Sequence, residues 1–486
     1  MNLTINEIAS AVNGKAFIKD GKLKVTGVVL DSRIVTDGGV FIATKGERVD
    51  GHSFIGQVLE KGVKLIITEK TPEEVAESYG TPVDDWCDYI IVEDSFVAIK
   101  KIAIAYRSKL TIPIIGITGS VGKTSTKEFV AGVLSEKYNV YKTEKNFNNE
   151  LGVPITILRI RDEHEVAVVE MGISDFGEMT RLSEVARPDI AVITNIGQCH
   201  LENLKTRDGI LKAKTEIFTH MNPDGRVCLF GGDDKLVTVG PVNNKEPLYF
   251  GEAGSGKALA VSVESSENRG LLGSKASIKI NLPEKGINNE VIDVQVPLPG
   301  HHMVINAAAA SLVSAMLGLS PEQIAAGIEN MQPISGRNHI MEVGSLTVID
   351  DCYNANPVSM KSSIDLLKLA KGKTVAILGD MFELGENEKE LHRSVGRYAV
   401  GQDVDYVYCI GKLSEYMYEA AREDWQHNGS RTTEISYWDT RERFIEGLKM
   451  DIKNGTHELI PEGSNILIKA SHGMHFEEIV KLFTEN

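Results

Sequence analysis

The chain has 486 residues, a formal net charge of -16 and 42% hydrophobic residues. A chain of this length usually folds as about three domains, and this composition is that of an ordinary globular protein. The acidic balance argues against a nucleic-acid partner held by a general attraction to phosphate.

The five cysteines are scattered and show no C-x-x-C spacing. Neither a disulfide framework nor a zinc site is therefore expected, and a reducing compartment fits best. No apolar run approaches the ~18 residues of a membrane span, and the first residues lack a basic segment followed by an apolar one. We expect a cytoplasmic protein without a membrane partner.

Residues 1–107 alternate short apolar runs with helical patterns and predict a small α/β domain. Strands are expected at 25–29, 39–43, 64–68 and 89–92, with a helix near 54–61. Loops at strand ends bind ligands in such domains, so Arg33, Lys45 and Arg48 are candidates for binding a diphosphate. Taken alone, these residues are explained slightly better as solvated turns.

A polar stretch at 107–113 predicts a linker to a second domain at 108–333. An apolar run at 112–115 then leads into Gly-Ile-Thr-Gly-Ser-Val-Gly-Lys-Thr-Ser at 116–125, which opens a helical pattern. In such a loop backbone N–H groups face phosphate oxygens, Lys123 reaches the β- and γ-phosphates, and the Thr124 hydroxyl can bind Mg²⁺. The loop is shorter than the strict G-x-x-x-x-G-K-[ST] pattern. A chance glycine turn is a poorer explanation, because the helix dipole disfavours a lysine at a helix N-terminus without an anion.

Two further expected strands end in polar residues at the same edge of the sheet. The apolar run 166–169 leads into Glu170, at the position where a carboxylate meets Mg²⁺ in nucleotide-binding domains. A strand at 190–194 leads into a segment with His200, which is as well explained as a structural histidine as by a role at this edge. By its spacing, Lys214 is a surface lysine.

Residues 227–299 predict a β excursion on the second domain, followed by helices at 300–317 and 320–331. A third domain is expected at 334–486, from Ser335-Gly-Arg337 onward. Its alternation of strands and helices indicates a parallel, Rossmann-like sheet, but no G-x-G-x-x-G supports a dinucleotide cofactor. Polar segments follow its expected strands at 350–357, 379–385 and 469–474.

Together these motifs resemble the Mur ligases of peptidoglycan assembly. The resemblance runs through nearly the whole chain and is most specific at Asn148-Asn149 with Gly152, at Asn195-Ile-Gly with His200-Leu-Glu, at 213–218 and at 350–357. The Asp-Asn-Pro-Arg motif of the diaminopimelate-adding relative is missing, which favours the branch that adds D-alanyl-D-alanine. At 469–472 the usual Lys-Gly-Ser-Arg reads Lys-Ala-Ser-His, so His472 is given no substrate contact.

The resemblance implies an α/β fold with three-domain Mur ligase architecture, a P-loop central domain and a Rossmann-like C-terminal domain. It implies an ATP-dependent amide ligase that joins D-alanyl-D-alanine to UDP-N-acetylmuramoyl-tripeptide through an acyl phosphate, with two Mg²⁺ ions. Another Mur-type or polyglutamate-type ligase with a different amino acceptor is the alternative. We expect a monomer whose second and third domains close over ATP.

The resemblance also implies the roles of single residues. The catalytic residues would be Lys123, Glu170, His200, Lys214 and Arg337. ATP would be bound by Gly119, Ser120, Val121, Gly122, Lys123, Thr124, Ser125, Asn306, Arg337 and Asp351. The metal ligands would be Thr124, Glu170, His200 and a carbamylated Lys214. The other substrates would be bound by Ser32, Arg33, Asn148 and Asn149.

Two other classes of protein fit the sequence less well. A GTPase should carry an Asn-Lys-x-Asp motif, and the nearest segment, Asn244-Lys-Glu-Pro247, lacks the final aspartate. A non-catalytic ATP-binding scaffold would be expected to lose Lys123, Glu170 or His200, and all three are present.

Overall fold

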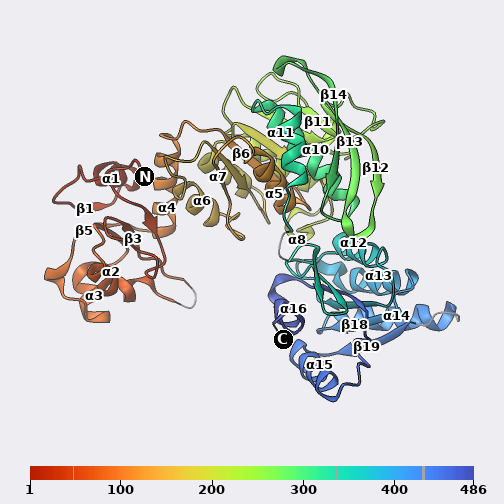
Figure 1. Cartoon of the computed structure of the whole chain (residues 1–486). Helices are drawn as coiled ribbons and strands as arrows, with labels where there is room; N and C mark the ends of the chain where they lie inside the picture. Colours follow the sequence, from red (N-terminus) through yellow and green to blue (C-terminus); the bar gives the residue numbers. More distant parts are fainter. Residues whose placement is uncertain (47–48, 334–335, 429–432, 486) are drawn as a thin grey trace.

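The structure is a computed structural model that describes residues 1–46, 49–333, 336–428 and 433–485. Figure 1 shows three α/β units, each built on its own sheet, with the second unit between the first and the third. None of the described helices has the length and apolar character of a membrane span. Arg48 and Ser335, which the sequence analysis singled out, lie outside the described residues.

The first unit is a five-stranded sheet of order β1-β5-β4-β3-β2, in which only β1 runs antiparallel to its neighbour. The predicted strands are confirmed, with ends shifted by up to three residues. The strands are β1 (Lys15–Phe17), β2 (Val28–Val29), β3 (Val40–Ile42), β4 (Leu65–Thr68) and β5 (Asp88–Ile91). The helices are α1 (Ile5–Val12), α2 (Ile55–Glu60), α3 (Pro72–Tyr79) and α4 (Ser95–Arg107).

Helix α4 joins the first unit firmly to the second. The Tyr106 hydroxyl donates a hydrogen bond to the backbone oxygen of Ile160 at 2.7 Å, and the buried Arg107 guanidinium lies 3.0 Å from the Asp189 carboxylate. Arg107 therefore ends a packed helix, whereas the sequence analysis had placed it at the start of a polar linker.

The second unit is a nine-stranded sheet of order β14-β13-β12-β11-β10-β9-β6-β8-β7. Strands β6 to β12 are parallel, and β13 and β14 are antiparallel additions at one edge. The strands are β6 (Ile114–Thr118), β7 (Val140–Lys142), β8 (Val166–Glu170), β9 (Ile190–Ile193), β10 (Arg226–Phe230), β11 (Leu248–Glu252), β12 (Val261–Asn268), β13 (Ser274–Leu282) and β14 (Ile287–Val296). The predicted excursion at 227–299 is thus mainly a continuation of the nucleotide sheet itself.

Helices cover both faces of this second sheet. Helices α5, α10 and α11 pack over one face, and α6, α7 and α9 over the other, where the apolar core continues into the first unit. The helices are α5 (Lys123–Leu134), α6 (Gly152–Leu158), α7 (Glu178–Ala186), α8 (Leu201–Leu204), α9 (Arg207–Thr215), α10 (His301–Met316) and α11 (Pro321–Glu329). Every residue of β6 and β8 is buried, as expected for parallel strands covered on both faces.

The third unit is a six-stranded sheet of order β15-β16-β20-β17-β18-β19, parallel except for β15. The last strand of the chain, β20, lies in the middle of this sheet. The strands are β15 (His339–Val343), β16 (Leu346–Asp350), β17 (Thr374–Gly379), β18 (Tyr406–Ile410), β19 (Glu434–Trp438) and β20 (Asn465–Lys469). The helices are α12 (Pro357–Leu367), α13 (Glu388–Gly401), α14 (Ser414–Asn428), α15 (Arg441–Asn454) and α16 (Glu477–Thr484). The sequence predicted this Rossmann-like alternation but not β15, β19 or α15.

Candidate functional site

The phosphate loop predicted at 116–125 connects β6 to α5. Gly122 caps α5 in the left-handed region with φ 82°, and a Cβ added at Gly119 would lie 1.9 Å from the Thr194 hydroxyl oxygen. Asn195 holds the loop: its backbone oxygen accepts from the Ser120 N–H at 3.1 Å, and its side-chain oxygen accepts from the Val121 N–H at 3.0 Å. The loop is therefore fixed by its neighbours at the end of β9.

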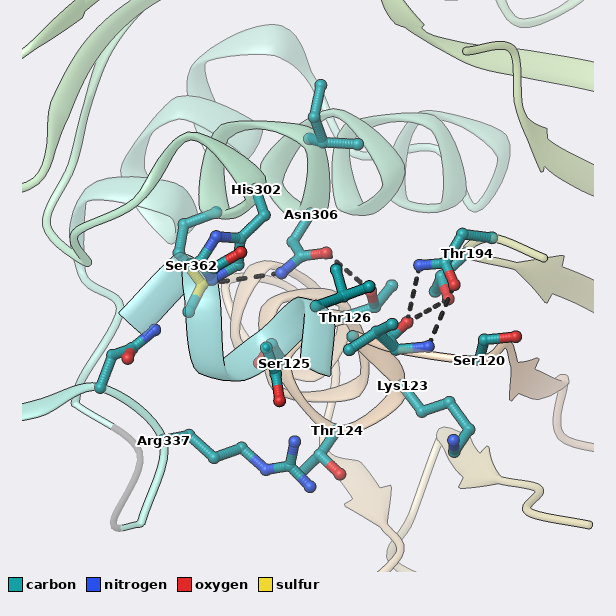
Figure 2. Close-up of a pocket in the computed structure, with 18 of the residues that line it drawn as sticks. Ser120, Lys123, Thr124, Ser125, Thr126, Thr194, His302, Asn306, Arg337 and Ser362 are labelled. Carbon is teal, nitrogen blue, oxygen red and sulfur yellow. Dashed lines mark hydrogen bonds between the residues drawn. The ribbon is translucent and has the colours of Figure 1, made fainter. Parts of the chain in front are cut away.

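A cavity of about 430 Å³ lies between this loop and the third unit (Figure 2). Apart from Gly119, every residue predicted to bind ATP lines this cavity, namely Ser120, Val121, Gly122, Lys123, Thr124, Ser125, Asn306, Arg337 and Asp351. The structure thus brings together residues of the second and third units that are more than 200 positions apart in the chain. Figure 2 shows the Arg337 side chain extending toward the loop.

The polar side chains that line the rest of the cavity differ in whether they already have a partner. The Asn306 side-chain oxygen, on α10, accepts from the Thr126 hydroxyl at 2.9 Å, and the Arg337 guanidinium lies 4.1 Å from the centre of the Tyr353 ring. Asn338 also lines the cavity, and its side-chain oxygen is buried without a hydrogen-bond partner among the residues that the structure describes. It is an acceptor that a hydroxyl or amino group of a nucleotide would satisfy.

Asp351 forms a buried ion pair at the wall of the cavity. The Lys469 ammonium, at the end of β20, lies 2.5 Å from the Asp351 carboxylate, which also accepts a hydrogen bond from the Ser363 hydroxyl at 2.5 Å. The Lys469 side chain is only 2% exposed, so its charge depends on this partner. The sequence pattern alone assigns no role to Lys469.

Replacing Asp351 with asparagine should therefore destabilise the protein, because it leaves the Lys469 ammonium buried without its counter-charge. We expect a loss of about 3 kcal/mol in the free energy of unfolding, measured as a lower midpoint of urea denaturation. The matched control is the pair of variants Lys469→Met and Asp351→Asn/Lys469→Met. The double variant should lose less than the sum of the two single changes, and strictly additive losses would contradict the ion-pair explanation.

Glu170, at the end of β8, is the centre of a buried network beside the loop. Its carboxylate accepts from the Thr124 hydroxyl at 2.9 Å and from the Asn148 amide at 2.8 Å. The ammonium of Lys127, whose side chain is 2% exposed, lies 3.7 Å away. Lys127 also donates to the backbone oxygen of Thr143 at 2.9 Å. Sequence reasoning missed Lys127, although it stands three positions after Thr124 and so shares its helix face.

Lys214 is buried, whereas its spacing had predicted a surface lysine. It lies in α9 and is 1% exposed. Burial, with a smaller contribution from the charge of Lys123, lowers the pKa of Lys214 to about 7. Among the described residues its ammonium has no carboxylate partner. A neutral amine at this position is therefore accessible near pH 7, where an ordinary lysine is almost fully protonated.

His200 stands at the start of α8 and contacts the third unit. Its Nδ1 atom lies 3.1 Å from a carboxylate oxygen of Glu383, and this contact with His200 is the main reason that the pKa of the Glu383 carboxyl is lowered. Glu383 belongs to the polar segment predicted after a strand of the third domain, but it was given no role there.

The donor set at this edge fits Mg²⁺ held together with a nucleotide. No group of three or more His, Cys, Asp or Glu residues within the described parts of the chain forms a ready-made metal cluster. The Thr124 hydroxyl and the Glu170 carboxylate are nevertheless adjacent. Mg²⁺ commonly takes one or two carboxylates and completes its shell with phosphate oxygens and water, so this pair is sufficient.

The four residues predicted to bind the other substrates are in two places. Asn148 joins the Glu170 network, and the Asn149 side chain accepts from the Gly152 N–H at 2.9 Å, which shapes the turn before α6. Ser32 and Arg33 lie in the first unit and do not line the cavity. Arg33 pairs with Asp31 at 2.7 Å and its side chain is largely exposed.

Comparisons with known proteins cover nearly the whole chain. Three family models match: the catalytic domain of the Mur ligase family at residues 24–115, the Mur ligase middle domain at 117–314, and the Mur ligase glutamate ligase domain at 336–470. The chain is 34% identical to the UDP-N-acetylmuramoyl-tripeptide--D-alanyl-D-alanine ligase of Bacillus subtilis (strain 168), over 99% of this chain and 98% of that one. It is 29% identical to the ligase of the same name from Escherichia coli (strain K12), over 100% and 99%.

Solved structures are also similar to this chain over nearly its whole length. The chain is similar to MurF from Acinetobacter baumannii, with a TM-score of 0.83 and 29% identity over 100% of this chain and 99% of that one. It is also similar to MurF ligase from Thermotoga maritima in complex with ADP, with a TM-score of 0.77 and 27% identity over 96% and 99%.

Proposed function

Because the chain belongs to the Mur ligase family, we propose that it joins D-alanyl-D-alanine to UDP-N-acetylmuramoyl-tripeptide in peptidoglycan precursor synthesis, with conversion of ATP to ADP and phosphate. The full-length relatives that carry this activity in their names support the choice of substrates. The observation that carries the proposal is the cavity between the phosphate loop and the third unit, with Lys123 on one side and Arg337 on the other.

The proposed reaction has two steps. The substrate carboxylate attacks the γ-phosphoryl group of ATP, which gives an acyl phosphate and releases ADP. The neutral amine of D-alanyl-D-alanine then attacks the acyl carbon, loses a proton and displaces phosphate. Both reactants of the first step are anions, so positive charge must be supplied around the transferring oxygens. Lys123 and Arg337 supply it from opposite sides of the cavity. Mg²⁺, when bound, adds charge neutralisation at the phosphate oxygens.

The remaining nucleotide contacts follow from the cavity lining. We assign the backbone N–H groups of residues 119–125 to the phosphates, Asn306 to the adenine and Asp351 to the ribose. Arg337 and Asp351 come from the third unit and the loop from the second, so closure of the two over ATP would also exclude water from the acyl phosphate.

We assign the metal ligands to four side chains. Thr124 and Glu170 would hold the first Mg²⁺, and His200 would bind a second. Carbamylation would convert Lys214 from a cation into a carboxylate-like group that can approach the metals. The lowered pKa of Lys214 supports this assignment, because only a neutral amine reacts with carbon dioxide.

We also propose which residues contact the other two substrates, where the domain boundaries lie, and in what form the protein acts. Ser32 and Arg33 would contact the UDP group, and Asn148 and Asn149 would lie near the tripeptide carboxylate. We place the domain boundaries at 107/108 and 333/334. We further propose that the protein acts as a cytoplasmic monomer.

The test is a phosphate-release assay with ATP and every combination of the two other substrates. Phosphate release should require both UDP-N-acetylmuramoyl-tripeptide and D-alanyl-D-alanine, and tripeptides ending in lysine and in diaminopimelate should be compared side by side. Glutamate in place of D-alanyl-D-alanine is the control for a polyglutamate-type ligase. Turnover that continues undiminished when either substrate is left out would falsify the assignment.

A further inference from the structure

Arg337, one of the two cationic side chains assigned to the transferring phosphoryl group, is stacked on an aromatic ring. The central carbon of its guanidinium lies 4.1 Å from the centre of the Tyr353 ring, and both residues line the cavity. In the part of the chain that the structure describes, no carboxylate lies within ion-pair distance of this guanidinium, so no ion pair competes with the stacking. The nucleotide assignments above give no role to Tyr353.

The backbone on both sides of Arg337 is tied to the segment that carries Tyr353. The Gly336 oxygen accepts from the Tyr353 N–H at 3.1 Å, and the Asn338 N–H donates to the Asp351 carboxylate at 3.2 Å. Gly336 has φ 73°, and a Cβ added there would lie 3.2 Å from the Tyr353 Cβ. A larger residue at position 336 would therefore strain the turn and push the two segments apart. The chain thus places Arg337 beside the ring before any nucleotide binds.

We propose that Tyr353 is a positioning residue that holds the Arg337 side chain extended toward the phosphate loop, as seen in Figure 2. The negative face of an aromatic ring attracts a guanidinium, and the flat stacking of the two planes restricts the rotamers of the arginine. An arginine without this support would lose more side-chain freedom each time ATP binds. This inference rests on the proposed function, since it takes Arg337 as a cation at the γ-phosphoryl group.

The ring of Tyr353, and not its hydroxyl, should be the part that positions Arg337. Burial raises the pKa of Tyr353 above its ordinary value, so the side chain stays a neutral phenol beside the cation. The attraction is then between the guanidinium and the ring face, which phenylalanine also provides. Loss of the ring should therefore weaken the binding of nucleotides that carry a γ-phosphate and leave the binding of ADP unchanged.

Isothermal titration of the full chain with ADP and with a non-hydrolysable β,γ-imido analogue of ATP, both with Mg²⁺, tests the proposal without turnover. Tyr353→Leu should weaken binding of the analogue by about 3-fold to 30-fold, the range that corresponds to a cation–π contact, and leave ADP binding unchanged. Tyr353→Phe should bind both nucleotides as the unaltered protein does. The matched control is Tyr418→Leu, which removes a ring 5.5 Å from another arginine of the third unit, Arg422, away from the cavity. It should not change either affinity.

A double-variant cycle separates the positioning of Arg337 from a direct contact between Tyr353 and the nucleotide. Arg337→Ala alone should weaken binding of the analogue more than binding of ADP. In that background Tyr353→Leu should cause no further loss, because no guanidinium is left to position. Additive losses would mean that Tyr353 contacts the nucleotide itself, and they would overturn the proposal.

Unchanged affinity of Tyr353→Leu for the analogue, or an equal loss of affinity for ADP in a folded variant, would also overturn the proposal. Tyr353→Met, which likewise replaces the ring by an apolar chain, takes the place of Tyr353→Leu if the latter does not fold. Failure of the proposed function gives a different result. In that case the unaltered chain releases no phosphate that depends on the two other substrates, whereas the nucleotide affinities of the variants still follow the pattern above.

Discussion

Replacement of Lys214 by alanine should reduce amide formation by about 10³-fold, because it removes the group that carbamylation would turn into a metal ligand. Lys214 is buried in α9, and its pKa is lowered to about 7. Phosphate release with all three substrates measures the loss. The extent of carbamylation should also fall as the pH drops below about 7, since protonation removes the amine that reacts with carbon dioxide.

Three comparisons separate this role from damage to the fold. Short carboxylic acids such as formate or acetate should partly restore turnover in Lys214→Ala, because they can occupy the place of the carbamate. Lys214→Met should be inactive and yet at least as stable to heat as the unaltered protein, since it replaces a buried amine by an apolar chain. Lys212→Ala, at an exposed position two residues earlier, should be fully active. Near-normal turnover of Lys214→Ala would rule out the carbamate.

Replacement of Glu170 by glutamine should lower turnover by about 10²-fold and remove the dependence of nucleotide binding on Mg²⁺. Glutamine keeps the shape of the side chain and can still accept from Thr124 and Asn148, but it lacks the charge that Mg²⁺ requires. Isothermal titration with ADP, with and without Mg²⁺, measures this effect directly.

The control for this variant is Glu128→Gln. Glu128 is the other carboxylate beside Lys127, with 3.1 Å between the charged atoms, so its loss leaves the same buried ammonium with one partner fewer. Both variants should lose some stability, by about 1–3 kcal/mol. Only Glu170→Gln should lose the effect of Mg²⁺, and an equal loss in Glu128→Gln would mean that the metal does not bind at Glu170.

The parts of the fold that could be predicted are those with local signals. A run of apolar residues ending in Glu170, and a glycine loop between a strand and a helix, identify β8 and the β6–α5 connection without tertiary information. Strands β15 and β19 were missed because they lie at the sheet edges, are only partly buried and show no clean alternation. Helix α15 buries Phe444 and Leu448 but lacked a recognised start signal, although Thr440 caps it by accepting from the Arg443 N–H.

The site residues also fall into two groups: those that a local sequence pattern predicts, and those whose surroundings depend on packing between distant parts of the chain. The loop residues 119–125 were predicted from their own pattern, whereas Asn306, Arg337 and Asp351 were proposed as ATP-binding residues from the family resemblance. Lys214 was misread by spacing, because its burial depends on how α9 packs against the sheet and not on its neighbours in sequence. Glu383 gives no local signal, since its partner His200 lies 183 positions earlier in the chain.

The central position of β20 has a consequence for how the protein is made. Until residues 465–469 are synthesised, β16 and β17 have no strand between them, and Asp351 lacks its partner Lys469. The third sheet is then two separate pieces, and pairing them requires contacts across more than 90 residues of chain, which form slowly. The wall of the cavity that contains Asp351 and Lys469 can therefore be completed only after synthesis has passed residue 469.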